Sequence, residues 1–253
     1  MIQAITDFSS NVSPIDFALI FSHWRLFAAG LANTLILFIL TTVVGGLIAI
    51  PLGVARAFRI PVLSSLILGY TFVFRGTPLL VQTYFLYYGA GEFSAVRDSF
   101  AWPLLREAWG CAFIAFSVNT AAYVTEIVCG GIQAVPVGEV EAAKATGMLP
   151  LARLRRIILP SAFRRMLPTY SNEVIFALHA TVVASTITIM DVLGAGRALN
   201  GMYYLAYEGF IAAGLIYLLL TVGVTRLFRF LERSLNRHLL PHDDAATERV
   251  RVN

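Results

Sequence analysis

Hydrophobic residues in this chain form long runs that are separated by shorter segments carrying most of the charge. The run from Leu26 to Ala55 contains no Asp, Glu, Lys or Arg. An α-helix rises about 1.5 Å per residue, so such a run can cross the roughly 30 Å hydrocarbon core of a bilayer. We therefore predict a first membrane-spanning helix at about 31–54 and an all-α membrane protein.

The remaining apolar runs predict four more spans, at about 76–91, 108–128, 174–190 and 209–225. The polar segment Asp191–Arg197 is expected to cap the fourth of them. With about five spans in total, the two ends of the chain should lie on opposite sides of the membrane.

The segment Ile60–Phe74 is uncharged but has only 15 residues, which is short for a span. It is either an interfacial helix that leads into the second span or the first half of that span, and we favour an in-plane elbow. Arg75 follows, and its charge must face protein, water or headgroups because lipid contact is too costly. Pro78 suits the first turn of the next helix, where its missing N–H would have no partner.

Composition agrees with this membrane assignment. The chain is 58% hydrophobic and only 13% charged, and its net charge of +4 does not by itself indicate nucleic-acid binding. Cys111 and Cys129 fall on or beside one predicted helix, roughly 27 Å apart along its axis, which is too far for a disulfide. We expect neither a metal nor a redox role for them.

Positive charges are distributed unevenly between the two sides of the predicted spans. With Arg75 and the distal tail set aside, twelve Lys and Arg residues share a side with segment 136–165 and four lie opposite. Cytoplasmic loops are enriched in Lys and Arg, so this segment and the C-terminus should be cytoplasmic and the N-terminus outside. The twelve are Arg56, Arg59, Lys144, Arg153, Arg155, Arg156, Arg164, Arg165, Arg226, Arg229, Arg233 and Arg237; the four are Arg25, Arg97, Arg106 and Arg197.

Segment 136–165 is predicted to form a short helix, a glycine stop and a second helix. Glu139 and Glu141 fall in the expected first turn, where the helix dipole favours anions, and Lys144 falls near the other end. Gly147 can end this helix in the left-handed conformation.

The second helix of this segment can begin at Pro150. Ahead of the glycine, Ala142 and Ala143 form a small apolar shoulder beside a carboxylate. Such a surface is suited to docking against a partner and not to catalysis.

The order Glu141-Ala142-Ala143, then Gly147, then Ile157-x-Leu159-Pro160 resembles the EAA loop of ABC importer permeases. In that family the loop is the coupling helix, which sits in a groove on a cytoplasmic ATPase subunit. The resemblance implies that this chain contacts the ATPase through Glu139, Glu141, Ala142, Ala143 and Gly147.

Three further stretches are similar to the polar amino-acid uptake branch of that family: Phe74–Leu79, Asn119–Tyr123 and Pro168–Glu173. Val118 is a mild departure, because leucine is frequent before the Asn-Thr pair. Leu178-His179-Ala180-Thr181 resembles the histidine, arginine and opine permeases, whereas glutamine-type relatives usually carry Lys-Asp at the two middle positions. The resemblance covers about 31–232.

This resemblance implies a type I ABC importer permease fold in a bacterial inner membrane. The implied partners are two ATP-binding cassette subunits, a second permease subunit, a periplasmic substrate-binding protein, an amino-acid substrate and membrane lipid, with no nucleic acid and no cofactor. We expect a periplasmic segment at 1–30, the permease domain at 31–232 and a cytoplasmic tail at 233–253, with Arg226–Asn253 solvated and partly disordered.

The first rival function is an ion-coupled secondary transporter or channel, and the second is a membrane enzyme or a purely structural assembly factor. No internal repeat supports the first. No HExxH spacing or comparable catalytic set supports the second. A Walker-type phosphate loop is also absent from the sequence, so ATP hydrolysis is expected on a separate subunit.

Polar residues within the predicted spans are candidates for the substrate path. Asn119, Tyr123 and Glu126 share one helical stripe at i, i+4 and i+7. Glu126 either serves the path or sits among waters at headgroup level. The path candidates are Asn119, Tyr123, Glu173, Thr77 and His179.

Structural readings compete for two of these candidates. Glu173 either lines a water-filled path or pairs with Arg164 or Arg165. His179 is more often a hydrogen-bonded residue between helices than a substrate ligand, and nearby Ser and Thr residues are more often interhelical contacts.

Overall fold

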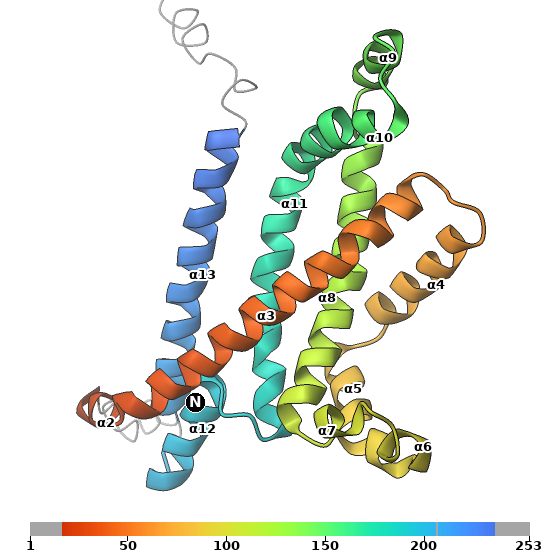
Figure 1. The fold of residues 1–253 in the computed structure, drawn as a ribbon. Helices are drawn as coiled ribbons and strands as arrows, with labels where there is room; N and C mark the ends of the chain where they lie inside the picture. The colour runs from red at the N-terminus through yellow and green to blue at the C-terminus, as the bar shows by residue number, and fades with distance from the viewer. Residues whose placement is uncertain (1–16, 206, 236–253) are drawn as a thin grey trace, which may run out of the picture. The chain divides into compact units, whose positions relative to one another are not determined.

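The computed structural model describes residues 17–205 and 207–235, and every regular element in those ranges is helical (Figure 1). Three helices are long and apolar enough to cross a membrane: α3 (Trp24–Ala57), α8 (Ala108–Gln133) and α13 (Glu208–Leu235). Two bent helix pairs pass the same test, Leu63–Gly76 with Leu79–Glu92 and Pro150–Ile187 with Val192–Tyr203. The count is therefore three spans, or up to five if each bent pair is one span.

The chain divides into two units. The first contains the described residues up to Gly45 together with Gly76–Thr120 and Phe176–Thr221. The second contains Gly46–Arg75, Ala121–Ile175 and the described residues from Val222. Helices α3, α8, α11 (Leu159–Ala180) and α13 contribute residues to both.

The first unit has two apolar cores. One joins Leu37 of α3 to Ala112 and Phe116 of α8 and to Ile187 of the 3₁₀ helix η4 (Thr181–Ile187). The other gathers apolar side chains from α2 (Phe17–Ser22), α3, α12 (Val192–Tyr203) and α13. At Gly196 and Gly209 the backbones of α12 and α13 touch, since a Cβ at Gly209 would lie 2.2 Å from the Gly196 carbonyl oxygen. Small residues allow such close helix approach in membranes.

The second unit has one apolar core, built on α8. Val124, Val128 and Ile132 of that helix pack with Ala49 of α3 and with Ala162 of α11. Their spacing of four residues places the α8 side chains on one helical face. This core fixes the helices that carry segment 136–165.

The predicted spans match helices, but several ends differ. The first span begins at Trp24 and not at Leu31, because Phe27 is already buried in the α12–α13 core. The expected periplasmic segment 1–30 therefore overlaps α3 from Trp24 onward. The third span extends to Gln133.

The second span is more irregular than predicted. It consists of α5 (Leu79–Tyr84), the π-helix η1 (Phe85–Gly89) and the 3₁₀ helix η2 (Ala90–Glu92), and Pro78 is its N-cap. Before it, α4 (Leu63–Gly76) is a regular helix, and the pair is bent at its break. The in-plane orientation of this segment stays a prediction. Two short helices, α6 (Ser94–Arg97) and α7 (Trp102–Leu105), occupy the polar stretch before α8.

The predicted start of the fourth span was wrong. The helical run begins with α10 (Pro150–Arg153) and the π-helix η3 (Leu154–Ile158) and continues as α11, so it precedes Val174 by several turns. The arginines of this stretch indicated a surface helix separate from the span. Arginine is a good helix former, however, and the apolar face of Ile158 and Ala162 packs on α8.

The end of the fourth span was also assigned incorrectly. Asp191 caps the N-terminus of α12, a helix that the pattern did not reveal, and does not close the helix before it. The last helix, α13, continues through Arg226 to Leu235 instead of ending near Thr225. The rest of the expected cytoplasmic tail lies outside the described residues.

Candidate functional site

Segment 136–165 folds as the predicted helix, glycine stop and second helix. Helix α9 (Val137–Ala145) ends where the Gly147 N–H donates to the Lys144 carbonyl at 2.9 Å and the Met148 N–H to the Ala143 carbonyl at 3.2 Å. Gly147 has φ +74°, so the end is a Schellman motif. Pro150 then opens α10 at its first turn, as expected.

The side chains of α9 divide between an inner and an outer face. Ala143 is buried at 5% exposure, whereas Glu141 and Ala142 are exposed, as is Gly147 after the helix. Both glutamates were predicted in the first turn of this helix. Glu139 lies there, whereas Glu141 lies in the second turn of α9. Of the two alanines predicted to form an apolar docking surface, only Ala142 is therefore available to another molecule, because Ala143 is buried.

Large apolar side chains are also exposed around this segment. Val137 is 69% exposed, Leu149 74% and Leu151 66%. Exposed apolar side chains in such a group are typical of a surface that contacts a partner or membrane.

An ion pair links the start of α9 to α11. The Arg165 Nη2 donates to the Glu139 Oε1 at 3.2 Å, and the Arg165 Nε lies 3.4 Å from the Ser161 hydroxyl. More than a third of each ionic side chain is exposed, so the pair adds little stability. It does connect α9 to α11.

The structural reading of Glu173 as a partner of Arg164 or Arg165 is wrong for the described residues. Arg165 pairs with Glu139, and Glu173 forms no ion pair within the described ranges. Arg75 is a cation of the same unit. Glu173 is partly buried in α11, so its carboxylate lies in the second unit with that cation.

Tyr123 holds Arg75 in place. The Arg75 guanidinium lies over the Tyr123 ring at 5.2 Å from the centroid, and the Tyr123 hydroxyl donates to the Arg75 carbonyl at 3.3 Å. A cation over an aromatic face is attracted by the ring's negative π cloud. The structure thus brings Arg75 into contact with one predicted path residue, Tyr123, in the unit that also contains Glu173.

Thr77 and Asn119 meet through Gln82, which the sequence reasoning did not single out. The Gln82 amide donates to the Thr77 hydroxyl at 2.7 Å and to its carbonyl at 3.0 Å, and the Asn119 amide donates to the Gln82 carbonyl oxygen at 3.2 Å. The sequence could have indicated Gln82, because it places an amide side chain within the mostly apolar second span.

His179 takes part in an interhelical hydrogen bond. Its Nε2 lies 2.9 Å from the Thr221 hydroxyl of α13, which confirms the structural alternative for this residue. The imidazole is nevertheless exposed in α11.

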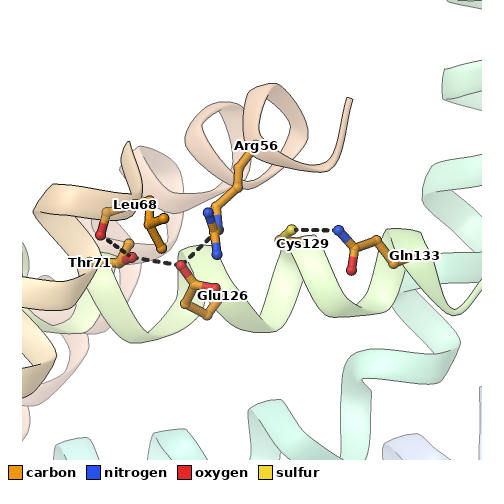
Figure 2. A network of polar contacts seen from close by, with 6 residues as sticks. All are labelled: Arg56, Leu68, Thr71, Glu126, Cys129 and Gln133. Carbon is orange, nitrogen blue, oxygen red and sulfur yellow. Dashed lines mark hydrogen bonds and ion pairs between the residues drawn. The ribbon is translucent and has the colours of Figure 1, made fainter. Parts of the chain in front are cut away.

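Glu126 has partners that neither sequence reading anticipated (Figure 2). Its Oε1 lies 2.9 Å from the Arg56 Nε of α3 and accepts from the Thr71 hydroxyl of α4 at 2.7 Å. One carboxylate therefore joins α3 and α4 to α8. Cys129, one turn further on, accepts from the Gln133 amide at 3.4 Å.

Asp191 is the buried carboxylate that the pattern assigned to the wrong helix. It is 1% exposed, accepts from the Gly194 N–H at 2.6 Å, and accepts from the Tyr217 hydroxyl at 3.2 Å. The Tyr217 hydroxyl also lies 3.1 Å from the Thr181 hydroxyl. These hydrogen bonds connect the start of α12 to α13 and to η4 within the first unit.

Comparison with known proteins finds relatives that are named as permease proteins of transport systems. The chain is 45% identical over 222 residues to the octopine transport system permease protein OccM of Rhizobium radiobacter, covering 88% of this chain and 91% of that one. It is 40% identical over 213 residues to the histidine/lysine/arginine/ornithine transport system permease protein HisM of Escherichia coli K12, covering 84% and 90%.

A solved structure is also similar to this chain. The crystal structure of an amino acid ABC transporter with histidines matches with a TM-score of 0.78 and 30% identity, covering 88% of this chain and 100% of that chain. Residues 49–237 match the family described as the binding-protein-dependent transport system inner membrane component. With its long apolar helices and its helix–glycine–helix segment, this chain belongs to that family of inner-membrane permease components.

Proposed function

We propose that this chain is the permease subunit of an ATP-driven importer that moves polar or basic amino acids, or related opines, into the cytoplasm. The observation that carries the proposal is α9, a helix closed by a Schellman motif with Glu141 and Ala142 exposed. Such a short, rigid helix beside exposed apolar residues is suited to a socket on another subunit.

The proposed partners are two ATPase subunits, a second permease subunit and a substrate-binding protein outside the membrane. In this arrangement the ATPase contacts Glu141 and Ala142 on the cytoplasmic side, and the N-terminus lies outside. Closure of the ATPase pair moves α9, and the Glu139–Arg165 ion pair carries that movement to α11.

The proposed substrates follow from relatives that are named for octopine and for histidine, lysine, arginine and ornithine. These relatives are similar over most of this chain. We assign Glu173 to the path of a cationic side chain, with Tyr123 positioning the neighbouring Arg75. Thr77 and Asn119 are proposed as polar contacts in the first unit, with Gln82 between them. His179 remains a candidate contact, because its imidazole is exposed.

The test is uptake by the complete transporter in proteoliposomes. We expect labelled arginine, histidine or octopine to accumulate only with the binding protein outside and ATP inside. An ATPase variant that cannot hydrolyse ATP is the control. Uptake that persists without ATP and collapses with an ionophore would instead establish an ion-coupled transporter.

A further inference from the structure

A cavity of about 330 Å³ lies beside α9, within the second unit. Its charged lining consists of three arginines, Arg156, Arg164 and Arg165, and one carboxylate, Glu139. Ligand cavities in proteins begin at about 300 Å³, and a water molecule takes about 30 Å³ of liquid volume. The cavity is therefore large enough for a solvated anionic group.

The positive charge in this cavity exceeds what the protein itself neutralises. Glu139 pairs with Arg165 at 3.2 Å. Arg156 and Arg164 form no ion pair with any residue in the described ranges. Two guanidinium groups thus face the cavity without a carboxylate partner there, which favours an anion in solution or at a membrane surface.

The remaining lining includes hydrogen-bonding and apolar groups. Ser161 contributes a hydroxyl, and Leu235 contributes an apolar side chain. Positions 157, 160, 161 and 164 follow the i, i+3, i+4, i+7 spacing, so one face of the α10–α11 run forms a wall of the cavity. Guanidinium groups bind phosphate through paired N–H donors, which a hydroxyl can supplement.

The position of the cavity at the end of α13 indicates where such a phosphate would come from. Leu235 is the last residue of α13, a candidate membrane span of 28 residues. At 1.5 Å per residue, this helix is about 42 Å long, whereas the hydrocarbon core is roughly 30 Å thick. Its end therefore reaches the headgroup region. Phe230, five residues earlier on α13, is 68% exposed, as expected for a side chain that contacts acyl chains.

We propose that this cavity binds the phosphate group of an anionic phospholipid, on the face that the proposed topology places in the cytoplasm. Arg156 and Arg164 hold the phosphate directly. A bound phosphate also competes with Glu139 for Arg165, so lipid binding changes how firmly α9 is held to α11. The site is a regulatory lipid site, and its lining residues are distinct from those of the proposed substrate path.

The experiment uses the complete transporter in nanodiscs that contain phosphatidylglycerol and phosphatidylcholine, with native mass spectrometry of retained lipid. Wild type should retain phosphatidylglycerol selectively. Arg156→Gln and Arg164→Gln should each lower its retention roughly fivefold, the effect of one arginine near an anionic surface. Arg155→Gln is the matched control, because Arg155 is exposed on the same turn and does not line the cavity.

Several outcomes would overturn this proposal. Absence of selective retention by wild type would do so even if the variants fail to assemble, and so would equal retention by wild type and the double variant. Inorganic phosphate that binds in phosphatidylcholine discs and displaces phosphatidylglycerol would replace lipid with a soluble source. Retention that appears only in the Asp243→Asn/Asp244→Asn variant would assign the cavity to these two carboxylates of the chain itself. Uptake measured in parallel separates these results from failure of the transporter itself.

Discussion

Arg56 and Glu126 form an ion pair with 2.9 Å between Nε and Oε1, and each side chain is only 20% exposed. The Thr71 hydroxyl donates to the same carboxylate oxygen at 2.7 Å. The three residues come from α3, α8 and α4 (Figure 2). A carboxylate in a membrane protein is costly unless it is paired, and these partners provide that pairing.

Glu126→Gln should therefore destabilise the second unit. It leaves Arg56 with an uncompensated charge, and removing one partner of a buried ion pair costs roughly 3–5 kcal/mol. We expect lower membrane abundance and a lower unfolding temperature of the purified subunit, with residual uptake falling in proportion. Thr71→Val, which removes only the hydroxyl, should give a smaller change. Normal abundance with selective loss of uptake in Glu126→Gln would instead show that Glu126 serves the substrate path.

Gly147→Val should abolish transport and leave the protein in the membrane. No other group lies within 4 Å of a Cβ placed at Gly147, so the penalty is conformational and arises from φ +74°. A side chain with a Cβ costs about 1 kcal/mol or more in this conformation. Gly147→Asn is the matched control, since asparagine tolerates the left-handed region. Wild-type uptake by a well-expressed Gly147→Val variant would contradict a role for this turn in coupling.

Ala142→Trp should separate the ATPase from the permease. Ala142 is exposed on α9, so the new indole meets a partner's surface and not the chain's own core. We expect the yield of co-purified ATPase to fall at least several-fold while permease abundance stays constant. Ala95→Trp, on exposed helix α6, controls for an added aromatic residue. Unchanged ATPase yield and activity would remove Ala142 from the proposed interface.

The features that sequence predicted well are local ones. The Gly147 stop, the Pro150 start and the apolar runs of α3 and α8 depend on residues within one or two turns. Such features follow from backbone preference and helix length alone. They were enough to identify the segment that resembles the coupling loop.

The features that sequence missed depend on distant partners. Glu126 meets Thr71 from 55 positions away, and His179 meets Thr221 from 42 positions away. No period or motif encodes such pairs, because helix packing brings them together. The continuation of the helix that starts at Pro150 into α11 was missed because its arginines mask the apolar face that packs on α8.

Glu173→Gln should reduce uptake of cationic substrates more than that of neutral ones. The change keeps size and hydrogen bonding but removes the charge, which a cationic side chain would otherwise use. Arg75 limits the effect, because its own positive charge already acts on Glu173. Pairing with Arg164 or Arg165 does not offer an alternative explanation, since Arg165 pairs with Glu139 and no ion pair joins Glu173 to Arg164 in the described ranges. The variant therefore tests the proposed use of this charge by a substrate.

Membrane abundance should be measured beside uptake of arginine, histidine and glutamine. A substrate role predicts near-normal abundance, the largest loss for arginine and the smallest for glutamine. Tyr123→Phe is a useful companion, because it removes the hydroxyl bond to the Arg75 carbonyl and keeps the ring beneath the guanidinium. If Tyr123→Phe leaves the arginine-to-glutamine ratio unchanged while Glu173→Gln lowers it, the effect comes from the carboxylate and not from displacement of Arg75. Equal losses for all three substrates that follow abundance would leave Glu173 with a structural role alone.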